Sequence, residues 1–407
     1  MPRLRGPVAA PTISRQLNLF PVQHLARVPA SSSNVRRFRT AAVLGAVLAC
    51  LGCRVGGRTI VIGLAGPFSE ARGRSMKLAA QLAVQEINRA GGVSGRPLEL
   101  RVADDSASSA RAIAVALRLR DDADVVAVIG HLTSGTTIAA AGIYNGGRHP
   151  VAAISPSASN PDLTGIGRYS FRLCATDLVH GTVLAQHAIR QLGARAAAVI
   201  YLNDEYGRGI LATFASEFRR LGGTIVTQDP VLAGSEDLGP YLDRIQRQAR
   251  AQVLMVAGDR ATGVTVLRQA RARGIELPLI GGDGLSGIQS EGAIAEGVQL
   301  TVNYLPDGPG ERNAAFLRAY AAFSGNERPD NRGAGAYDAV HLIAEAVRAA
   351  GTDRAKIRDA LAQLGHGRPP WDGVTGRISF DDKGDVPGKT VFVGVVRGGQ
   401  LLLAGRP

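Results

Sequence analysis

Hydroxyl side chains gather in the segment 130–137, which reads Gly-His-Leu-Thr-Ser-Gly-Thr-Thr and directly follows the apolar run 125–129. Hydroxyls and free N–H groups at the start of a helix form a site for an anion, and the helix dipole adds attraction. A carboxylate bound there gains charge-assisted hydrogen bonds, each worth roughly 1.5–3 kcal/mol. The segment therefore predicts a carboxylate site at Ser134, with a plain helix cap as the alternative.

A second polar loop, Ser-Pro-Ser-Ala-Ser-Asn-Pro at 155–161, follows the next apolar run, 151–154. Ligands of open α/β sheets bind outside the carboxyl ends of the strands. Two such loops on neighbouring strands can therefore face one small polar ligand through Ser157 and Ser159. Taken alone, this loop is equally well explained as a turn.

The segment 282–287 matches the pattern G-x-G-x-x-G that marks some dinucleotide sites. Asp283 would place a carboxylate where the pyrophosphate must bind, and no clear strand ending in an acid follows about 20 residues later. A dinucleotide is therefore rejected. The same glycines let the backbone turn and present Asp283 to an ammonium group.

The sequence motifs give little support to a catalytic site or a metal site. Ser134 lies three residues from His131, a spacing that rarely places a base correctly, and no G-x-S-x-G nucleophile turn is present. The seven histidines form no H-E-x-x-H pattern, so no zinc site is expected. The acidic turn at 381–385 is expected to be a turn and not a calcium site. We expect neither an enzyme nor a cofactor.

The elements that position these loops alternate between short apolar strands and helices. Strands are expected at 59–64, 98–102, 125–129, 151–154, 196–201, 224–226, 252–256, 278–280 and 298–302. The clearest helix is 74–90, with apolar residues recurring at helical spacing and two glycines after it. Uniformly apolar strands between helices predict parallel sheets covered on both faces.

The alternation of strands and helices is interrupted twice, at 170–177 and at the Pro- and Gly-rich segment 303–310. Three helices (314–323, 335–350 and 355–364) and a β meander (376–380, 390–396 and 401–403) follow. These breaks predict two doubly wound α/β lobes with the chain crossing between them.

The formal net charge of +13 does not predict nucleic-acid binding. Seven arginines fall in residues 1–49, which contain no acidic residue, and the rest of the chain has no basic block with interleaved aromatics. Residues 1–49 are interpreted as a basic extension and a signal peptide, with three arginines before the uncharged run 41–49. The true start is expected nearer Val35.

The signal ends Val-Leu-Ala-Cys at 47–50, followed by Leu-Gly-Cys. This resembles a bacterial lipoprotein signal, in which Cys50 becomes the lipidated N-terminus. Cys53 fits less well, and an ordinary secretory peptide remains the alternative. Cys174 is then left without a partner and is expected to be a buried small hydrophobe.

The order of several motifs resembles the branched-chain amino-acid substrate-binding proteins of ABC importers over roughly residues 58–400. The motifs are Gly66-Pro67-Phe68, the segment 86–96, Asp104-Asp105, 130–135, 154–160, Tyr206-Gly207, 281–284, 336–339 and 380–385. The resemblance implies a type I periplasmic binding protein: a Venus-flytrap of two α/β lobes joined by three crossovers. Lobe 1 would comprise 58–174 and 304–375, and lobe 2 would comprise 175–303 and 376–407.

The same resemblance implies roles for individual residues. Ser134 and Ser159 would bind a ligand carboxylate with help from the Ser157 backbone, Asp283 would hold the ammonium, and Tyr206 would face the cleft. The partners implied are a small-molecule ligand and a membrane ABC permease. The protein would be exported to the periplasm or cell surface and held there by its lipid anchor.

Three positions that are often aromatic in this family correspond here to Arg72, Asp259 and Arg332. Aromatic walls suit aliphatic side chains, whereas guanidinium and carboxylate groups suit a polar or acidic one. We therefore expect a ligand with an amino-acid-like head and a hydrophilic tail.

Two other binding functions are compatible with the same cleft. A ligand-sensing ectodomain would share every feature above, and only a neighbouring permease and ATPase would distinguish an importer component from it. A LacI-like repressor would need an N-terminal helix-turn-helix, but residues 35–53 read as a signal.

Overall fold

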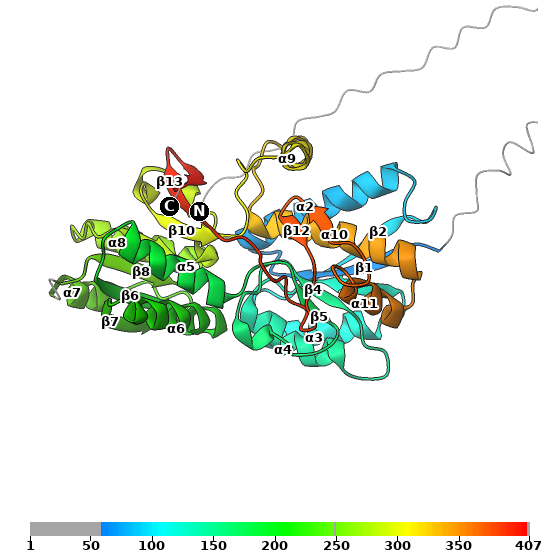
Figure 1. Cartoon of the computed structure of the whole chain (residues 1–407), viewed down its shortest axis with the longest axis horizontal. Helices are drawn as coiled ribbons and strands as arrows, with labels where there is room; N and C mark the ends of the chain where they lie inside the picture. Colours follow the sequence, from blue (N-terminus) through cyan, green and yellow to red (C-terminus); the bar gives the residue numbers. More distant parts are fainter. Residues whose placement is uncertain (1–57, 248–249, 405–407) are drawn as a thin grey trace, which may run out of the picture. The chain divides into compact units, whose positions relative to one another are not determined.

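The structure is a computed structural model that describes residues 58–247 and 250–404, all within a single compact unit of the chain (Figure 1). Its first sheet is parallel throughout and has the order β2-β1-β3-β4-β5. The strands are β1 (Ile60–Gly66), β2 (Leu98–Asp104), β3 (Val125–Ile129), β4 (Ala153–Ser155) and β5 (Ser170–Arg172).

Helices cover both faces of this sheet because successive side chains of each strand point to opposite faces. Ile60, Ile62 and Leu64 of β1 join one core with α2 and α10, whereas Val61 and Ala65 join another with α3 and α4. The helices of this half are α2 (Ala71–Arg89), α3 (Ser109–Asp121), α4 (Ser134–Asn145), α9 (Glu311–Ser324), α10 (Asn331–Ala350) and α11 (Arg354–Ala362).

The second sheet has the order β14-β13-β10-β9-β8-β6-β7. Its parallel strands are β6 (Ala196–Leu202), β7 (Thr224–Val231), β8 (Val253–Ala257), β9 (Leu279–Gly281) and β10 (Gln299–Val302). The hairpin of β13 (Phe392–Arg397) and β14 (Gln400–Leu403) adds antiparallel to β10.

The second sheet is also covered on both faces. Ala197 and Val199 of β6 pack with α5 (Asp177–Arg190) and α6 (Glu205–Arg220). Ala198 and Ile200 of the same strand pack with α7 (Gly239–Arg247) and α8 (Arg260–Ala272). Short 3₁₀ turns lie at Pro161–Leu163, Asp283–Leu285 and Ile288–Ala295. The predicted class, a doubly wound α/β fold with two parallel-rich sheets, is confirmed.

We call the first sheet with its helices lobe 1 and the second sheet with its helices lobe 2. Within the described residues the chain passes between them after β5, after β10 and after β12 (Gly376–Ile378). The predicted C-terminal meander is wrong in its first strand, because β12 pairs with β11 (Trp371–Gly373) and not with β13. Ile378 and Phe380 pack in the lobe 1 core, so the predicted boundary at 376 falls inside this hairpin.

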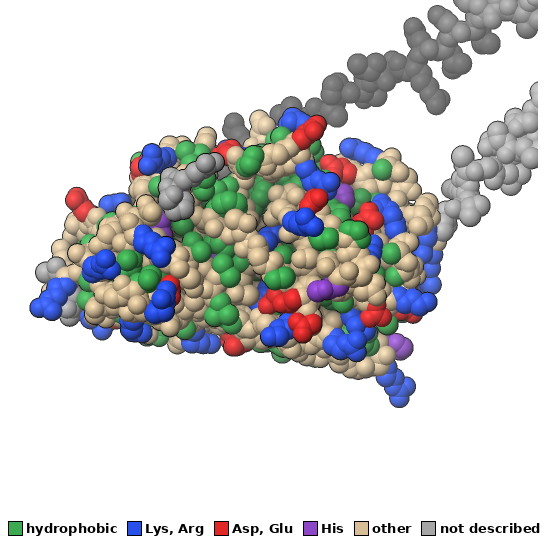
Figure 2. Space-filling model, viewed as in Figure 1, with side chains coloured by type: hydrophobic (Ala, Val, Ile, Leu, Met, Phe, Trp, Pro, Cys, Tyr) green, Lys and Arg blue, Asp and Glu red, His purple; other side chains and the backbone are tan. Residues whose placement is uncertain are grey.

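Charged side chains of both signs are interspersed on the face shown in Figure 2. Within the described residues no helix is long and apolar enough to cross a membrane. The predicted signal peptide and the candidate lipidation site, Cys50 or Cys53, lie outside the described residues. Cys174 is free and buried, as predicted.

Candidate functional site

A cavity of about 60 Å³ is lined by loops at the carboxyl ends of strands from both lobes. Seven of the eight predicted binding residues line it, and Ser159 is the exception. The lining comprises Arg72, Leu132, Thr133, Ser134, Ser157 and Arg332 from lobe 1, and Leu202, Asp204, Tyr206, Asp259, Asp283 and Gly284 from lobe 2.

The hydroxyl side of the cavity is the start of α4. Thr133, not Ser134, is the N-cap, and its Oγ1 accepts from the Thr136 N–H at 3.4 Å. Ser134 Oγ accepts the Asn160 N–H at 3.3 Å, and the side chain is almost completely buried. The Ser134 hydroxyl hydrogen is therefore available to a ligand, and the capping alternative applies to its neighbour.

The second polar loop is held firmly by its own contacts. Ser157 Oγ donates to the Leu132 carbonyl at 2.8 Å, so this side chain is committed to the protein. Ser159 Oγ is fully buried and has no hydrogen-bond partner among the described residues. Buried hydroxyls are usually paired, and the carboxyl group that the Ser159 hydroxyl influences is the buried Asp177, which does not line the cavity.

Arg172 holds the loop 155–161 in place through hydrogen bonds to its backbone. Its guanidinium donates to the carbonyls of Ala158 (3.4 Å) and Asn160 (2.8 Å). The same group pairs with Asp385 at 2.6 Å, in the segment that crosses from β12 to β13. The acidic turn 381–385 is thus a structural partner of Arg172. Within the described residues, no group of three or more His, Cys, Asp or Glu side chains could hold a metal ion.

The acidic side of the cavity is built around Asp283 and Tyr206. The Tyr206 hydroxyl donates to Asp283 Oδ1 at 3.1 Å and accepts the Gly284 N–H at 2.8 Å. Burial, with the Asp283 charge second, raises the pKa of Tyr206 well above its usual value, so the phenol stays protonated and remains a donor. Asp283 Oδ2 has no partner among the described residues.

The glycines of the G-x-G-x-x-G segment serve this contact. A Cβ on Gly284 would lie 2.4 Å from the Gly258 carbonyl oxygen and 2.6 Å from Cε1 of Tyr206. The missing side chain allows the tyrosine ring to pack against the loop. The glycine pattern therefore positions an acid, Asp283, beside a phenol, Tyr206.

Arg72 and Asp259 meet across the cavity, each oriented by another group. Arg72 Nε donates to Glu70 at 2.6 Å, and its Nη1 lies 3.5 Å from Asp259 Oδ2. Asp259 caps α8, with Oδ1 accepting from the N–H and hydroxyl of Thr262 at 2.9 and 2.8 Å. One carboxylate oxygen and the outer edge of the guanidinium are left facing the cavity.

Arg332 makes more contacts with the protein than Arg72 does. It pairs with Asp330 at 2.9 Å and donates across the cleft to the carbonyls of Asp283, Gly284 and Ser286 at 3.3–3.4 Å. It therefore holds the Asp283 loop of lobe 2 from a helix of lobe 1.

Two acidic residues escaped the sequence reasoning. Asp204 lines the cavity and caps α6, with Oδ1 accepting the Gly207 N–H at 2.7 Å. Desolvation is the main cause that raises its pKa. Its position at a strand end, two residues before Tyr206, was a signal that could have been used.

Asp177, at the start of α5, is completely buried, and neither carboxylate oxygen has a partner among the described residues. Burial and then the nearby Asp283 charge raise its pKa well above the usual value. Nothing in its apolar-flanked sequence indicated this proximity.

His131 is a structural residue. Its Nδ1 lies 2.6 Å from Asp105 and its Nε2 lies 3.1 Å from the Tyr144 hydroxyl, and the ring is fully buried. Both ring nitrogens are therefore occupied by groups other than Ser134, and the pair does not form a nucleophile and base.

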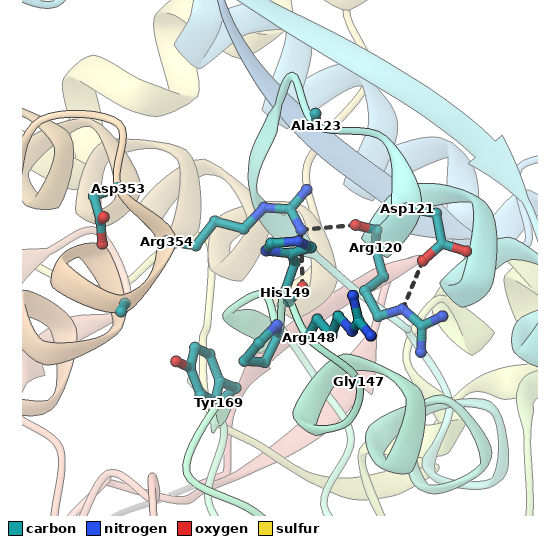
Figure 3. Close-up of a pocket in the computed structure, with 11 residues that line it drawn as sticks. Arg120, Asp121, Ala123, Gly147, Arg148, His149, Tyr169, Asp353 and Arg354 are labelled. Atoms are coloured by element: carbon teal, nitrogen blue, oxygen red, sulfur yellow. Dashed lines mark hydrogen bonds and ion pairs between the residues drawn. The ribbon is translucent and has the colours of Figure 1, made fainter.

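A larger cavity of about 520 Å³ lies in lobe 1 and shares no residue with the cleft (Figure 3). Two of its basic groups already make hydrogen bonds within the protein. Arg354 donates to the carbonyls of Arg120 (2.7 Å), His149 (3.0 Å) and Val125 (2.7 Å), and Arg120 Nε donates to Asp121 at 2.8 Å. These bonds tie the start of α11 to loops of the first sheet, so this cavity is a weaker candidate than the cleft.

Comparison with known proteins identifies the family of the chain. Residues 59–400 match the profile of a family described as periplasmic binding protein. An amino acid binding protein of Pseudomonas aeruginosa is 30% identical over 341 residues, covering 80% of this chain and 87% of the relative.

Two crystal structures are similar as well. LivJ of Streptococcus pneumoniae, a branched-chain amino acid transporter substrate-binding protein in complex with isoleucine, is 30% identical with a TM-score of 0.78, over 85% of this chain and 99% of LivJ. An ABC transporter substrate-binding protein of Desulfitobacterium hafniense in complex with Leu is 33% identical with a TM-score of 0.74, over 85% and 100% of the two chains.

Proposed function

The chain belongs to the periplasmic binding protein family, and from this premise we propose that it binds an α-amino acid or a close analogue with a polar tail in the cleft between its lobes. The bound solute is then delivered to a membrane permease of the ABC importer class. The observation that carries the proposal is that Ser134 of lobe 1 and Asp283 of lobe 2 line the same cavity. The isoleucine and leucine complexes of the similar proteins support an amino-acid head group.

The carboxylate of such a ligand is held by lobe 1. Ser134 accepts a backbone N–H and keeps its own hydrogen for an acceptor, and it lies in the first turn of α4, where the helix dipole favours negative charge. Ser159, the other serine expected to bind the carboxylate, is fully buried in the adjoining loop and does not line the cavity, so Ser134 supplies the free serine hydroxyl. Neutral donors suffice because a carboxylate strengthens each hydrogen bond it accepts.

The ammonium is held by lobe 2. Asp283 is 4% exposed, and only one of its oxygens is used by Tyr206. A buried carboxylate is costly unless it is paired, so the free oxygen favours a cationic group from the ligand. Tyr206 keeps the carboxylate in place and does not compete for that oxygen.

A ligand with its opposite charges on opposite lobes stabilises the closed form. It can shift the equilibrium between open and closed states only through contacts that differ between them, and each lobe alone supplies half of these contacts. Arg332 adds to the closed form by donating across the cleft to the loop that carries Asp283. Arg72, Asp259 and Arg332 form the polar wall for the tail.

The family consists of periplasmic binding proteins, so the chain is an exported protein. We infer that Cys50 is lipidated and tethers the lobes beside the permease, and that the protein carries out no catalysis. Mass spectrometry of the membrane-extracted protein is expected to show a lipid-modified N-terminal Cys50. A mature protein that starts elsewhere and lacks lipid would contradict the anchor without affecting the ligand site.

The test is a thermal-shift screen of the purified protein against amino acids, amides, short dicarboxylates and aromatic acids, followed by calorimetry. We expect a stabilising polar α-amino acid or analogue, with binding weakened by Ser134→Ala. The matched control is Ser108→Ala, because Ser108 caps α3 and does not line the cleft cavity. Tight binding of leucine with no response to polar amino acids or acyl amides would refute the polar tail. A response confined to aromatic acids or dicarboxylates would refute the amino-acid head.

A further inference from the structure

The charges that line the cleft cavity are unbalanced. Three carboxylates, Asp204, Asp259 and Asp283, face two guanidinium groups, Arg72 and Arg332. An α-amino acid with an uncharged tail has no net charge and would leave this difference in place. Uncompensated charge in a partly buried cavity is costly, so the imbalance carries information about the ligand.

Both arginines have another acidic partner outside the cavity lining, which increases the imbalance. Arg72 donates to Glu70 at 2.6 Å, and Arg332 pairs with Asp330 at 2.9 Å. Neither Glu70 nor Asp330 lines the inner cavity. The positive charges of Arg72 and Arg332 are therefore largely neutralised by Glu70 and Asp330. The three aspartates of the cavity lining are left with an excess of negative charge.

The contact between Arg72 and Asp259 is loose by comparison. Its N···O distance of 3.5 Å exceeds the 2.7–2.9 Å typical of a charge-assisted hydrogen bond. Arg72 keeps its shorter bond to Glu70 if this contact is lost. A ligand cation can therefore take the place of Arg72 at Asp259 Oδ2 without leaving the guanidinium unpaired.

Asp204 lies close enough to Asp259 for the two charges to influence each other. Asp204 has no ion pair among the described residues, and its pKa is raised by desolvation first and then by the charges of Glu205 and Asp259. Its Oδ1 is used by the helix cap and its Oδ2 is free. Asp204 and Asp259 together offer two carboxylate oxygens on the lobe 2 wall.

The space beyond this wall accommodates a long tail. An outer cavity of about 440 Å³ shares Arg72, Asp259, Gly284 and Arg332 with the inner one. Its remaining basic residues, Arg260 and Arg268, are both paired with Glu291 at 2.6 and 2.8 Å. The inner cavity has room for a compact head group, and the tail extends to Asp259, where the inner and outer cavities meet.

We propose that the ligand is an α-amino acid with a basic side chain, whose terminal cation is bound by Asp259 and Asp204 after displacing Arg72. This inference rests on the proposed function, because it assumes that the amino-acid head lies between Ser134 and Asp283. It narrows the hydrophilic tail to a cationic one. An acidic tail would be repelled by Asp204 and Asp259, and a neutral tail would leave the charge of Asp204 uncompensated.

Calorimetry with L-lysine, L-glutamine, L-glutamate and L-leucine at one pH and ionic strength tests the proposal. We expect lysine to bind at least about tenfold more tightly than glutamine, as one additional ion pair requires, and glutamate to bind most weakly. Glutamate, glutamine or leucine equal to or tighter than lysine would overturn the basic tail and leave the amino-acid function standing. No binding of any of the four would overturn both.

Two isosteric variants locate the effect. Asp259→Asn and Asp204→Asn keep a helix-capping side chain, so the fold is expected to survive. Each is expected to weaken lysine binding about tenfold or more while changing glutamine binding less than about threefold. Asp353→Asn, at the cap of α11 outside the cleft, is the matched control and should change neither. Equal losses for lysine and glutamine would contradict a charge-specific role.

The salt dependence of binding to the unmodified protein tests the proposal without any variant, so it does not depend on whether the variants fold. Raising the salt concentration from 50 to 500 mM is expected to weaken lysine binding more than glutamine binding, because the additional ion pair is screened. Identical salt dependence for the two ligands would overturn the proposal.

Discussion

Replacing Asp283 with Asn separates ligand affinity from protein stability. The substitution preserves the size of the side chain and an oxygen that can accept from Tyr206. It removes the negative charge and turns an N–H₂ group toward the ligand ammonium. Truncating one partner of a buried charge pair costs about 2–5 kcal/mol, so the dissociation constant is expected to rise roughly 30-fold to several thousand-fold.

The stability of the free protein is expected to change in the opposite sense. The Asp283 charge raises the pKa of the buried Asp177, so the two groups repel each other in the folded protein. Removing one charge relieves this repulsion, and the free energy of unfolding should stay the same or increase. Calorimetry gives the affinity, and urea denaturation of the ligand-free protein gives the stability. Unchanged affinity, or a loss of stability parallel to the loss of affinity, would refute the assigned role.

Other parts of the structure give further predictions. Burial lowers the pKa of His341 from 6.5 to about 4, so the folded state resists a proton that the unfolded chain accepts below pH 6.5. The free energy of unfolding should therefore fall by up to about 3 kcal/mol between pH 6.5 and 4. In His341→Phe this fall should be smaller by the same amount, and denaturation at several pH values measures both. A Gly284→Ala side chain would collide with the Gly258 carbonyl and Tyr206, so both stability and ligand affinity should decrease in denaturation and calorimetry. The control is Gly142→Ala inside α4, where nothing lies within 4 Å, and it should instead stabilise the protein by about 0.5–1 kcal/mol.

The alternation of apolar strands and helices was sufficient to predict the doubly wound α/β class. The runs 60–66 and 125–129 are apolar throughout because helices cover both sheet faces, and this leaves a signal in a single sequence. The two hydroxyl loops were predictable for the same reason, since they follow such strands directly. The partner of β12 was not predictable, because three-residue strands carry no register signal.

The acidic wall of the cleft was predicted only in part. Asp283 stood out because glycines flank it, whereas Asp204 occupies an ordinary helix-cap position without flanking glycines. That its other oxygen also faces the cavity depends on how the second lobe packs. The burial of Asp177 against Asp283 joins residues more than a hundred positions apart, and no local pattern encodes it.

The most direct test is a crystal structure of the protein with the amino acid or analogue that the screen selects. We predict that the ligand carboxylate lies within hydrogen-bond distance of Ser134 and that its ammonium contacts the free oxygen of Asp283. A ligand bound in the cavity near Arg354, or one in the cleft that contacts neither Ser134 nor Asp283, would contradict this prediction.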